Sequence, residues 1–209
     1  FVRGRVGAVL TQRPDLPRDV DSIYHLAATV GVRRVVERPV ETIRNNLEET
    51  GMLVEAAAAA GCRLLLASTS EVYGRSEQLP LKESDPLVYG PTTVARWGYG
   101  MSKALDEHLL LAAHRERRLD GRIVRLFNTI GPRQRGEYGM VVPRFVARAL
   151  RGEALEVYGD GSQIRTFCDV RDVVRALRQL MALEPARLPE RVFNVGSAQA
   201  ISIEALADR

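Results

Sequence analysis

The segment LLLASTSEVYG, residues 64–74, joins an apolar run to three hydroxyl side chains and a glutamate. Leu64 to Ala67 has the length and composition of a strand that is buried on both faces of a sheet. Ser68 to Glu71 follow directly, so they would lie at the carboxyl end of that strand. The sequence therefore predicts a buried strand that ends in a cluster of hydroxyls with a carboxylate beside them.

Apolar runs of strand length alternate with longer helical patterns along the rest of the chain. Strands are predicted at Ser22 to Ala27, Arg63 to Ser68, Arg122 to Phe127, Leu155 to Tyr158 and Arg191 to Val195. Helices are predicted at Pro39 to Ala60, Trp97 to Arg118, Met140 to Arg151 and near Asp169 to Leu183, followed by a short terminal helix with Ser202 as its N-cap. This alternation indicates an α/β fold, a doubly wound parallel sheet with helices on both faces.

The polar cluster at Ser68 to Glu71 has two interpretations. Ligands of doubly wound sheets bind beyond the carboxyl ends of the strands, which is where this cluster would lie. Alternatively, the hydroxyls bond only to backbone groups at the strand end and cap the turn. The cluster alone leaves both interpretations open.

A tyrosine and a lysine four residues apart, Tyr99 and Lys103 in the segment YGMSK, form a second candidate feature. On a helix these two side chains project from one face. The ammonium of Lys103 would then lower the pKa of the Tyr99 phenol and make a phenolate available as a base. Only Lys82 and Lys103 among the 30 basic residues are lysines, and composition alone predicts about 0.06 such pairs. A helix-surface lysine beside a half-buried tyrosine is the alternative interpretation.

The composition excludes several classes of protein. With 45% hydrophobic and 27% charged residues in 209, the chain is long enough for one sizeable domain and part of a second. Its apolar runs are shorter than the roughly 18 residues that a membrane span needs, so we expect a cytoplasmic protein without a membrane partner. Cys62 and Cys168 give no disulfide framework, and no cluster has the spacing of metal ligands. The net charge of +4 suits an anionic ligand, but the basic residues are scattered among acids, so nucleic acid is not expected as a partner.

Eight motifs follow one another along the chain. They are IYHLAA (residues 23–28), the helix with Asn46 and Thr50, STSEVYG (68–74), YGMSK (99–103), RLFNTIGPR (125–133), VVPRF (141–145), VYGDGSQIRTF (157–167) and FNVG (193–196). Together they resemble the extended short-chain dehydrogenase/reductase superfamily, and within it the nucleotide-sugar epimerases, dehydratases and decarboxylases. The resemblance implies a Rossmann-like fold, NAD as the cofactor with NADP also open, and a nucleoside diphosphate sugar as the substrate.

The resemblance also implies roles for individual residues. Tyr99 would remove the proton of a sugar hydroxyl while a hydride passes to the nicotinamide, Thr69 would hydrogen-bond that hydroxyl, and Lys103 would bind the nicotinamide ribose. The cofactor-binding residues would be His25, Leu26, Ala27, Ala28, Asn46, Ser68 and Phe127, together with Tyr99 and Lys103. The substrate-binding residues would be Ser70, Asn128, Arg144, Tyr158 and Arg165.

Glu71 is the position that separates the subclasses of this superfamily. Plain 4-epimerases usually lack an acid there, whereas UDP-glucuronate decarboxylases and GDP-mannose 4,6-dehydratases carry one. A decarboxylase would use Glu71 to handle the proton of the enolate that forms as carbon dioxide leaves, and a dehydratase would use it as the base at C5. Ser70 stands where glucose-type dehydratases have an aspartate. Residues 90–107 are more similar to the decarboxylases than to the mannose dehydratases. The sequence therefore most resembles UDP-glucuronate decarboxylases. Dehydratase, epimerase and a non-catalytic dinucleotide- or RNA-binding relative remain alternatives.

The chain departs from the superfamily at its start. The glycine-rich turn that presents backbone amides to the cofactor pyrophosphate is absent from the sequence. Gly4 and Gly7 are the nearest candidates, and we interpret their segment as the third strand of the complete fold. Glu49 also stands where the superfamily commonly has glycine. The simplest interpretation is a fragment that begins after the first βαβ unit and stops before the C-terminal segments, and that would be inactive by itself.

The resemblance further implies two domains and a dimer. Residues 1–130 would form an incomplete dinucleotide-binding domain. Residues 131–209 would form most of a substrate-binding lobe, with segments near 166–184 and 191–196 returning to the first domain. The predicted helices at Pro39 to Ala60 and Trp97 to Arg118 would form a four-helix interface in a homodimer.

Overall fold

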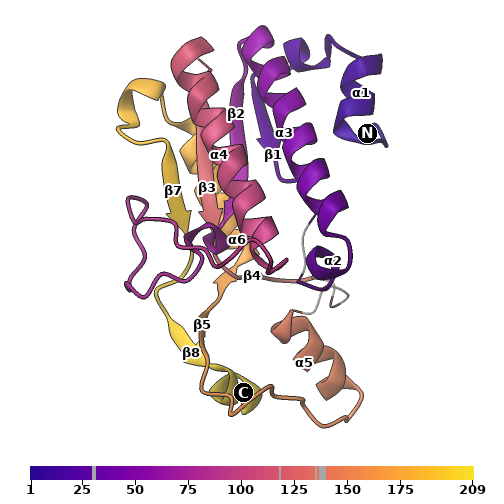
Figure 1. Cartoon of the computed structure of the whole chain (residues 1–209), viewed down its shortest axis with the longest axis vertical. Coiled ribbons are helices and arrows are strands. Elements are labelled where there is room, and N and C mark those ends of the chain that lie inside the picture. Colours follow the sequence, from indigo (N-terminus) through magenta and orange to yellow (C-terminus); the bar gives the residue numbers. More distant parts are fainter. Residues whose placement is uncertain (30–31, 118, 135, 137–139) are drawn as a thin grey trace.

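In the computed structural model, which describes residues 1–29, 32–117, 119–134, 136 and 140–209, four strands form one parallel sheet (Figure 1). They are β1 (Ser22–His25), β2 (Arg63–Thr69), β3 (Gly121–Leu126) and β7 (Val192–Val195), in the order β1-β2-β3-β7. Each neighbouring pair runs parallel, and the register sets Leu64 opposite Gly121. The predicted parallel sheet is confirmed.

Helices cover both faces of this sheet. They are α3 (Pro39–Ala60) and α4 (Trp97–Arg117) on the near face in Figure 1, and α6 (Val170–Ala182) on the far face. Successive side chains of a strand point to opposite faces. Accordingly, Leu64 and Leu66 pack with residues of α3 and α4, whereas Leu65 packs with residues of α6. The predicted doubly wound arrangement is therefore confirmed.

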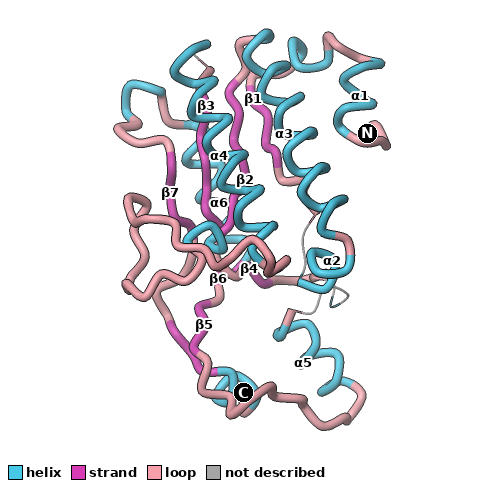
Figure 2. Tube along the Cα trace, in the orientation of Figure 1, coloured by secondary structure: helices cyan, strands magenta, loops and turns pink. Residues whose placement is uncertain are grey.

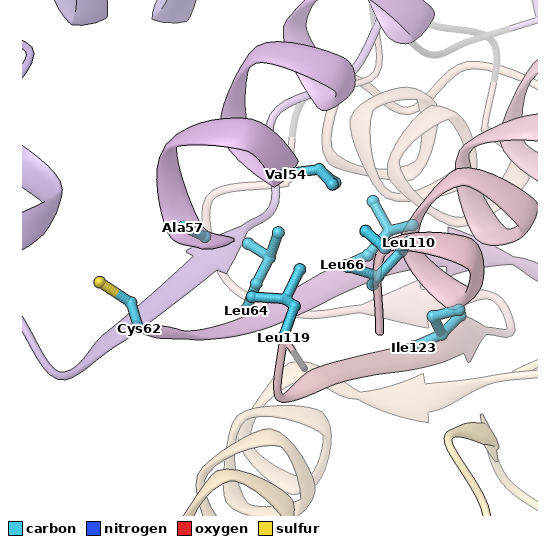
Figure 3. Packing of buried hydrophobic residues seen from close by; sticks show 9 residues of the cluster. Val54, Ala57, Cys62, Leu64, Leu66, Leu110, Leu119 and Ile123 are labelled. Carbon is cyan, nitrogen blue, oxygen red and sulfur yellow. The ribbon is translucent and has the colours of Figure 1, made fainter. Parts of the chain in front are cut away.

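The core between the sheet and the pair of helices α3 and α4 fixes where α4 lies. In Figure 3, Val54 and Ala57 of α3, Leu64 and Leu66 of β2 and Leu110 of α4 converge on one another. All five are buried, and Ala57 has no accessible surface. Burying a large aliphatic side chain contributes about 1.5–3 kcal/mol relative to leaving it exposed. This layer therefore holds the later part of α4, around Leu110, at a defined place beside β2.

The ends of the helices follow signals in the sequence. Pro39 occupies the first position of α3, where its missing N–H has no helical partner to lose. Gly61 ends α3 in the left-handed region with a φ of 71°. Ser202 caps α7 (Ile203–Ala207) by accepting a hydrogen bond from the N–H of Ala205 (3.1 Å), as predicted. The other predicted helices and β1, β2, β3 and β7 begin and end within one or two residues of the predicted positions, except that the predicted end of the helix from Trp97, at residue 118, lies outside the described residues.

The remaining elements are short. Those at the start are α1 (Val6–Gln12), η1 (Leu16–Asp19) and α2 (Val32–Glu37), and η2 (Ser70–Tyr73) follows β2. The later ones are β4 (Thr129–Ile130) paired with β6 (Cys168–Asp169), β5 (Ile164–Thr166) paired with β8 (Ala200–Ser202), α5 (Val141–Leu150) and η4 (Pro185–Arg187). Figure 2 shows a long loop between η2 and α4, and it shows α5, β5 and the C-terminus below the sheet. The arrowheads in Figure 1 point toward this lower part, so it lies on the side of the carboxyl ends of the strands.

One strand prediction is wrong at the start of the chain, where the segment with Gly4 and Gly7 contains α1 instead. Gly7 lies so close to α3 that an added Cβ would stand 2.4 Å from Sδ of Met52. The carboxylate of Glu49 accepts a hydrogen bond from the N–H of Gly7 (2.9 Å) and pairs with Arg5 (3.1 Å). A carboxylate at a helix N-terminus is stabilising. The glutamate that differs from the superfamily pattern thus has a local partner in α1.

A second strand prediction, Leu155 to Tyr158, is also wrong, because this segment is not paired in a sheet. Arg144 donates a hydrogen bond to the carbonyl of Glu156 (3.1 Å), and Arg148 donates one to the carbonyl of Ala154 (2.9 Å). Side chains of α5 therefore occupy backbone acceptors that a neighbouring strand would need.

Within the described residues, none of the helices is both long and apolar enough to cross a membrane.

Candidate active site

The candidate site begins where β2 ends. Thr69 is the last residue of β2, and its hydroxyl accepts a hydrogen bond from the backbone N–H of Glu71 (3.2 Å). Ser68 is buried, and its hydroxyl donates to the carboxylate of Glu107 in α4. Thr69 therefore does cap the strand end, as one interpretation predicted, while Ser68 connects the same strand end to α4.

Gly100 allows α4 to approach this strand end closely. A Cβ at Gly100 would lie 2.7 Å from the backbone oxygen of Glu71, so only glycine fits without a shift. The neighbouring Tyr99 consequently lies beside η2. A hydrogen bond with Thr69 and the charge of Glu71 both act on its phenol. The structure thus brings Thr69, Glu71 and Tyr99 together at the carboxyl end of β2.

The spacing of Tyr99 and Lys103 predicted a lowered pKa for the Tyr99 phenol. That prediction is wrong, because the pKa of the phenol is raised from its usual value. Burial is the largest cause, and the charges of Glu71 and Asp106 act in the same direction. The hydrogen bond with Thr69 opposes this shift without reversing it. Burial and two carboxylates therefore favour the neutral form of the Tyr99 phenol.

The pKa of Glu71 is raised as well. Glu71 is exposed at the surface, but the protein around the strand end reduces the solvation of its carboxyl group, which disfavours the charged form. Arg96, the residue before the first residue of α4, opposes this effect. Tyr99 and Glu71 therefore both hold a proton at a higher pH than they would in water.

Lys103 is engaged elsewhere on its own helix. Its side chain is 1% exposed, and its Nζ donates to Oδ2 of Asp106 at 2.9 Å. Much of the charge of the ammonium is thus balanced within α4. Lys103 also acts on His25 at the end of β1. The pKa of His25 is lowered to about 4, first by burial and second by the charge of Lys103, while the charge of Glu49 opposes this shift.

Asn46 fixes the chain that follows β1. Its side-chain oxygen accepts a hydrogen bond from the N–H of Thr29 (2.9 Å), and its amide donates to the hydroxyl of Ser102 (3.3 Å). Ser102 donates in turn to the carbonyl of Tyr99 (2.9 Å). The intervening residues 26–28, predicted to bind the cofactor, are exposed. Asn46 therefore ties an exposed stretch of backbone to the turn of α4 that carries Tyr99.

A buried ion pair beneath the site was missed by the sequence analysis. Arg125 on β3 donates to both carboxylate oxygens of Glu107, at distances from 2.8 to 3.2 Å. Arg125 also donates to the carbonyl of Glu83 (3.1 Å) in the loop between η2 and α4. Arginines are so frequent in this chain that a single one attracts little attention. The available signal was an arginine inside an apolar strand together with an acid one turn after Lys103.

Three further predicted residues lie just beyond the ends of β2 and β3. Ser70 begins η2 next to Glu71. Phe127 is half-buried and packs so closely on Gly196 that a Cβ there would be 2.8 Å from Cβ of Phe127. Asn128 is exposed, and its amide donates to the carbonyl of Thr166 (2.9 Å). These positions border the strand ends without a direct bond to the phenol of Tyr99 among the described residues.

The predicted substrate-binding residues of the lower part form a separate group. The guanidinium of Arg144 on α5 lies over the ring of Tyr158, 4.4 Å from its centroid. Arg165 lies on β5 and is exposed. Among the described residues, no hydrogen bond, ion pair or ring contact joins these three side chains to the cluster around Tyr99.

In the described part of the chain, no group of three or more His, Cys, Asp or Glu side chains is arranged to hold a metal ion.

Known proteins resemble this chain over most of its length. A UDP-N-acetyl-alpha-D-glucosaminuronate decarboxylase from Bacillus cytotoxicus is 39% identical over 194 residues, which are 92% of this chain and 59% of the relative. UDP-glucuronic acid decarboxylase 6 from Arabidopsis thaliana is 42% identical over 173 residues, 78% of this chain and 47% of the relative. The solved structure of MoeE5 in complex with UDP-glucuronic acid and NAD matches 98% of this chain and 65% of its own, with a TM-score of 0.80 and 33% identity. The chain thus spans about half the length of these curated relatives.

A family match agrees with these similarities. It covers residues 10–196, a range that includes all four strands of the sheet as well as Thr69, Glu71, Tyr99 and Lys103. Since the matched range contains both the fold and the cluster at the strand ends, the chain belongs to the NAD dependent epimerase/dehydratase family.

Proposed function

We propose that this chain carries the catalytic residues of an NAD-dependent enzyme that modifies a nucleoside diphosphate sugar, with UDP-glucuronate decarboxylation as its reaction. The observation that carries the proposal is the meeting of Thr69, Glu71 and Tyr99 at the carboxyl end of β2. The Bacillus and Arabidopsis relatives support the choice of reaction, since both are decarboxylases of glucuronic-acid-type sugar nucleotides.

Tyr99 and Thr69 would act on one hydroxyl of the sugar. When bound, NAD supplies the acceptor for the hydride of the sugar carbon C4. Tyr99 takes the proton of the C4 hydroxyl, and Thr69 holds that hydroxyl by a hydrogen bond, as it now holds the phenol. Because the pKa of the phenol is raised, Tyr99 needs a positive charge nearby to act as a base, and Lys103 is the nearest lysine in the sequence.

Glu71 would supply the proton that decarboxylation requires. With a ketone at C4 the sugar is a β-keto acid, so the bond from C5 to the carboxylate carbon breaks, carbon dioxide leaves, and the electron pair forms an enolate. Glu71 then delivers a proton to C5. Its raised pKa supports this role, because the carboxyl group keeps its proton to a higher pH than a solvated carboxyl does.

The donors at the strand ends fit a dinucleotide. The exposed backbone at residues 26–28, held in place by Asn46, offers N–H groups that can donate hydrogen bonds to phosphate oxygens. The ammonium of Lys103 can donate hydrogen bonds to ribose hydroxyls. The residues that would hold the cofactor are therefore His25, Leu26, Ala27, Ala28, Asn46, Ser68, Phe127, Tyr99 and Lys103. Those that would hold the sugar nucleotide are Ser70, Asn128, Arg144, Tyr158 and Arg165.

Two properties of the complete enzyme belong to the same proposal. Residues 1–130 would be its dinucleotide-binding domain and residues 131–209 most of its substrate-binding lobe, with α6 and β7 contributing to the first domain. A homodimer would form through α3 and α4, whose outer surfaces expose the apolar side chains of Ile43, Met52, Leu105 and Leu109.

The proposed reaction is tested on the full-length protein with NAD and UDP-glucuronate, by mass spectrometry of the sugar nucleotide. We expect wild type to release carbon dioxide and Glu71→Gln to do so about 10²–10⁴-fold more slowly, because the proton donor is lost. Glu77→Gln is the matched control, since Glu77 is an exposed glutamate in the loop that follows η2. It should retain the wild-type rate.

Other products would contradict the decarboxylase assignment. Loss of water from GDP-mannose or UDP-glucose would identify a dehydratase, and an unchanged mass with altered chromatographic mobility would identify an epimerase. Conversion of UDP-glucuronate at equal rates by wild type and Glu71→Gln would keep the reaction but remove the role of Glu71.

A further inference from the structure

A buried carboxylate pairs with the lysine of the candidate site. Asp106 stands three residues after Lys103 on α4, and its side chain has no accessible surface. Its Oδ2 accepts a hydrogen bond from Nζ of Lys103 at 2.9 Å. Removing two charges from water offsets much of their attraction, so the net stabilisation from such a pair is small. Its position on the helix face that also carries Tyr99 is more informative than its stabilising energy.

The elements around Asp106 leave Lys103 as its main counterion. Thr50 of α3 hydrogen-bonds to its carboxyl group, although Oδ1 has no partner with strict hydrogen-bond geometry among the described residues. His25 of β1 bonds to the same hydroxyl of Thr50 (3.1 Å). The lowered pKa of His25, about 4, keeps its imidazole neutral near pH 7. Thr50 and His25 thus add polar contacts without adding charge.

The other charged groups nearby are carboxylates or are already paired. Glu107, the next residue on α4, repels Asp106 but is itself bound by Arg125 of β3. Glu71 of η2, once ionised, acts on Tyr99 with a negative charge. Lys103 is therefore the cation that pairs with Asp106, and the charges of Glu71 and Asp106 both disfavour the phenolate of Tyr99.

We propose that Asp106 is a positioning residue: it holds the ammonium of Lys103 within α4 and opposes the loss of the Tyr99 proton. The proposal rests on the proposed function only in taking Tyr99 as the base. The pair of Lys103 and Asp106 has a net charge near zero, whereas Lys103 alone would bring a full positive charge to the site. Asp106 also acts on the phenol directly, in the direction that favours its neutral form. Lys103 can assist Tyr99 only to the extent that its bond with Asp106 weakens.

The test is a titration of Tyr99 in the full-length protein without cofactor or sugar nucleotide. Phenolate is measured by its ultraviolet absorbance, as the difference between each protein and its Tyr99→Phe counterpart. Asp106→Asn keeps the shape of the side chain and an acceptor for Lys103 but removes the charge. We expect about tenfold more Tyr99 phenolate at a given alkaline pH, equivalent to one unit of pKa. Glu116→Gln removes an exposed carboxylate from the same helix and should leave the titration unchanged.

A second measurement needs no variant at Asp106, since Asp106→Asn leaves Lys103 buried without its counterion and can impair folding. In the ¹⁵N spectrum of lysine-labelled protein, the Lys103 signal is assigned by its loss in Lys103→Arg. We expect it to persist under conditions where rapid exchange with water removes the signal of exposed Lys82. Equal exchange of both signals would overturn the proposal, as would an unchanged Tyr99 titration in folded Asp106→Asn.

Neither readout depends on conversion of a sugar nucleotide. A shifted titration in a protein that converts no sugar nucleotide would support the role of Asp106 and reject the proposed function. An unshifted titration in an active decarboxylase would do the reverse.

Discussion

At the scale of single residues, the chemistry of the site depends on which group holds each proton. Burial moves both Tyr99 and Glu71 toward their neutral forms. A neutral carboxyl group suits proton donation, whereas a neutral phenol must first be activated to accept a proton. The same environment thus favours the proposed role of Glu71 and restrains that of Tyr99. Asp106, the partner of Lys103, adds to that restraint.

His25 makes the stability of the fold depend on pH. Its pKa is about 4 in the folded protein, chiefly because the ring is buried, against an ordinary value of 6.5. Between these values the unfolded chain binds a proton that the folded chain does not bind. Stability is therefore fully present above pH 6.5 and falls as the pH drops to about 4. The loss should amount to about 3 kcal/mol.

Urea unfolding of wild type and His25→Gln across this pH range measures the effect. The variant should lose most of the slope, whereas His108→Gln, at an exposed position on α4, should keep it. An identical pH dependence in wild type and His25→Gln would mean that other groups cause the decline.

At the scale of the elements, Gly100 sets the distance between α4 and η2. Alanine usually stabilises a helix by about 0.5–1 kcal/mol relative to glycine. At Gly100 the added Cβ would instead meet backbone 2.7 Å away, so we expect Gly100→Ala to destabilise the protein by about 1–3 kcal/mol. Gly51→Ala in α3 is the matched comparison, because its Cβ would find only an ordinary contact with Leu109 at 3.8 Å. It should stabilise the protein.

Urea unfolding of the two alanine variants beside wild type measures both differences. Equal stabilisation by Gly51→Ala and Gly100→Ala would show that α4 and η2 can separate freely. The close approach would then not be what brings Tyr99 to Glu71.

The elements themselves were largely predictable, because their causes are local. Apolar periodicity marked β2, α3 and α6, and side-chain caps such as Ser202 mark a helix start within three residues. The start of α1 was not predictable in this way, since its N–H at Gly7 bonds to Glu49, 42 residues later. For the site, the sequence indicated Tyr99 and Lys103 on one helix face. It could not show that Asp106, also on that face, would bind the lysine, because this choice depends on burial.

At the scale of the whole molecule, the outer surfaces of α3 and α4 are the proposed dimer interface. Leu105 is 54% exposed there, so in a dimer a charge at this position would be buried without a partner. We expect Leu105→Glu to convert the full-length protein from dimer to monomer in sedimentation velocity. Leu150→Glu, at an exposed leucine on α5, should sediment like wild type. A monomeric wild-type protein would refute the interface.

Glu107 belongs to α4 but is shared by Ser68 of β2 and Arg125 of β3. Replacing any one of the three leaves a buried polar group without its partner, which costs about 1–3 kcal/mol or more when the group is charged. In evolutionary terms we therefore expect the three positions to be inherited as a unit. Over the history of the family, the strand end, the helix and the neighbouring strand should change at these positions together or remain as they are.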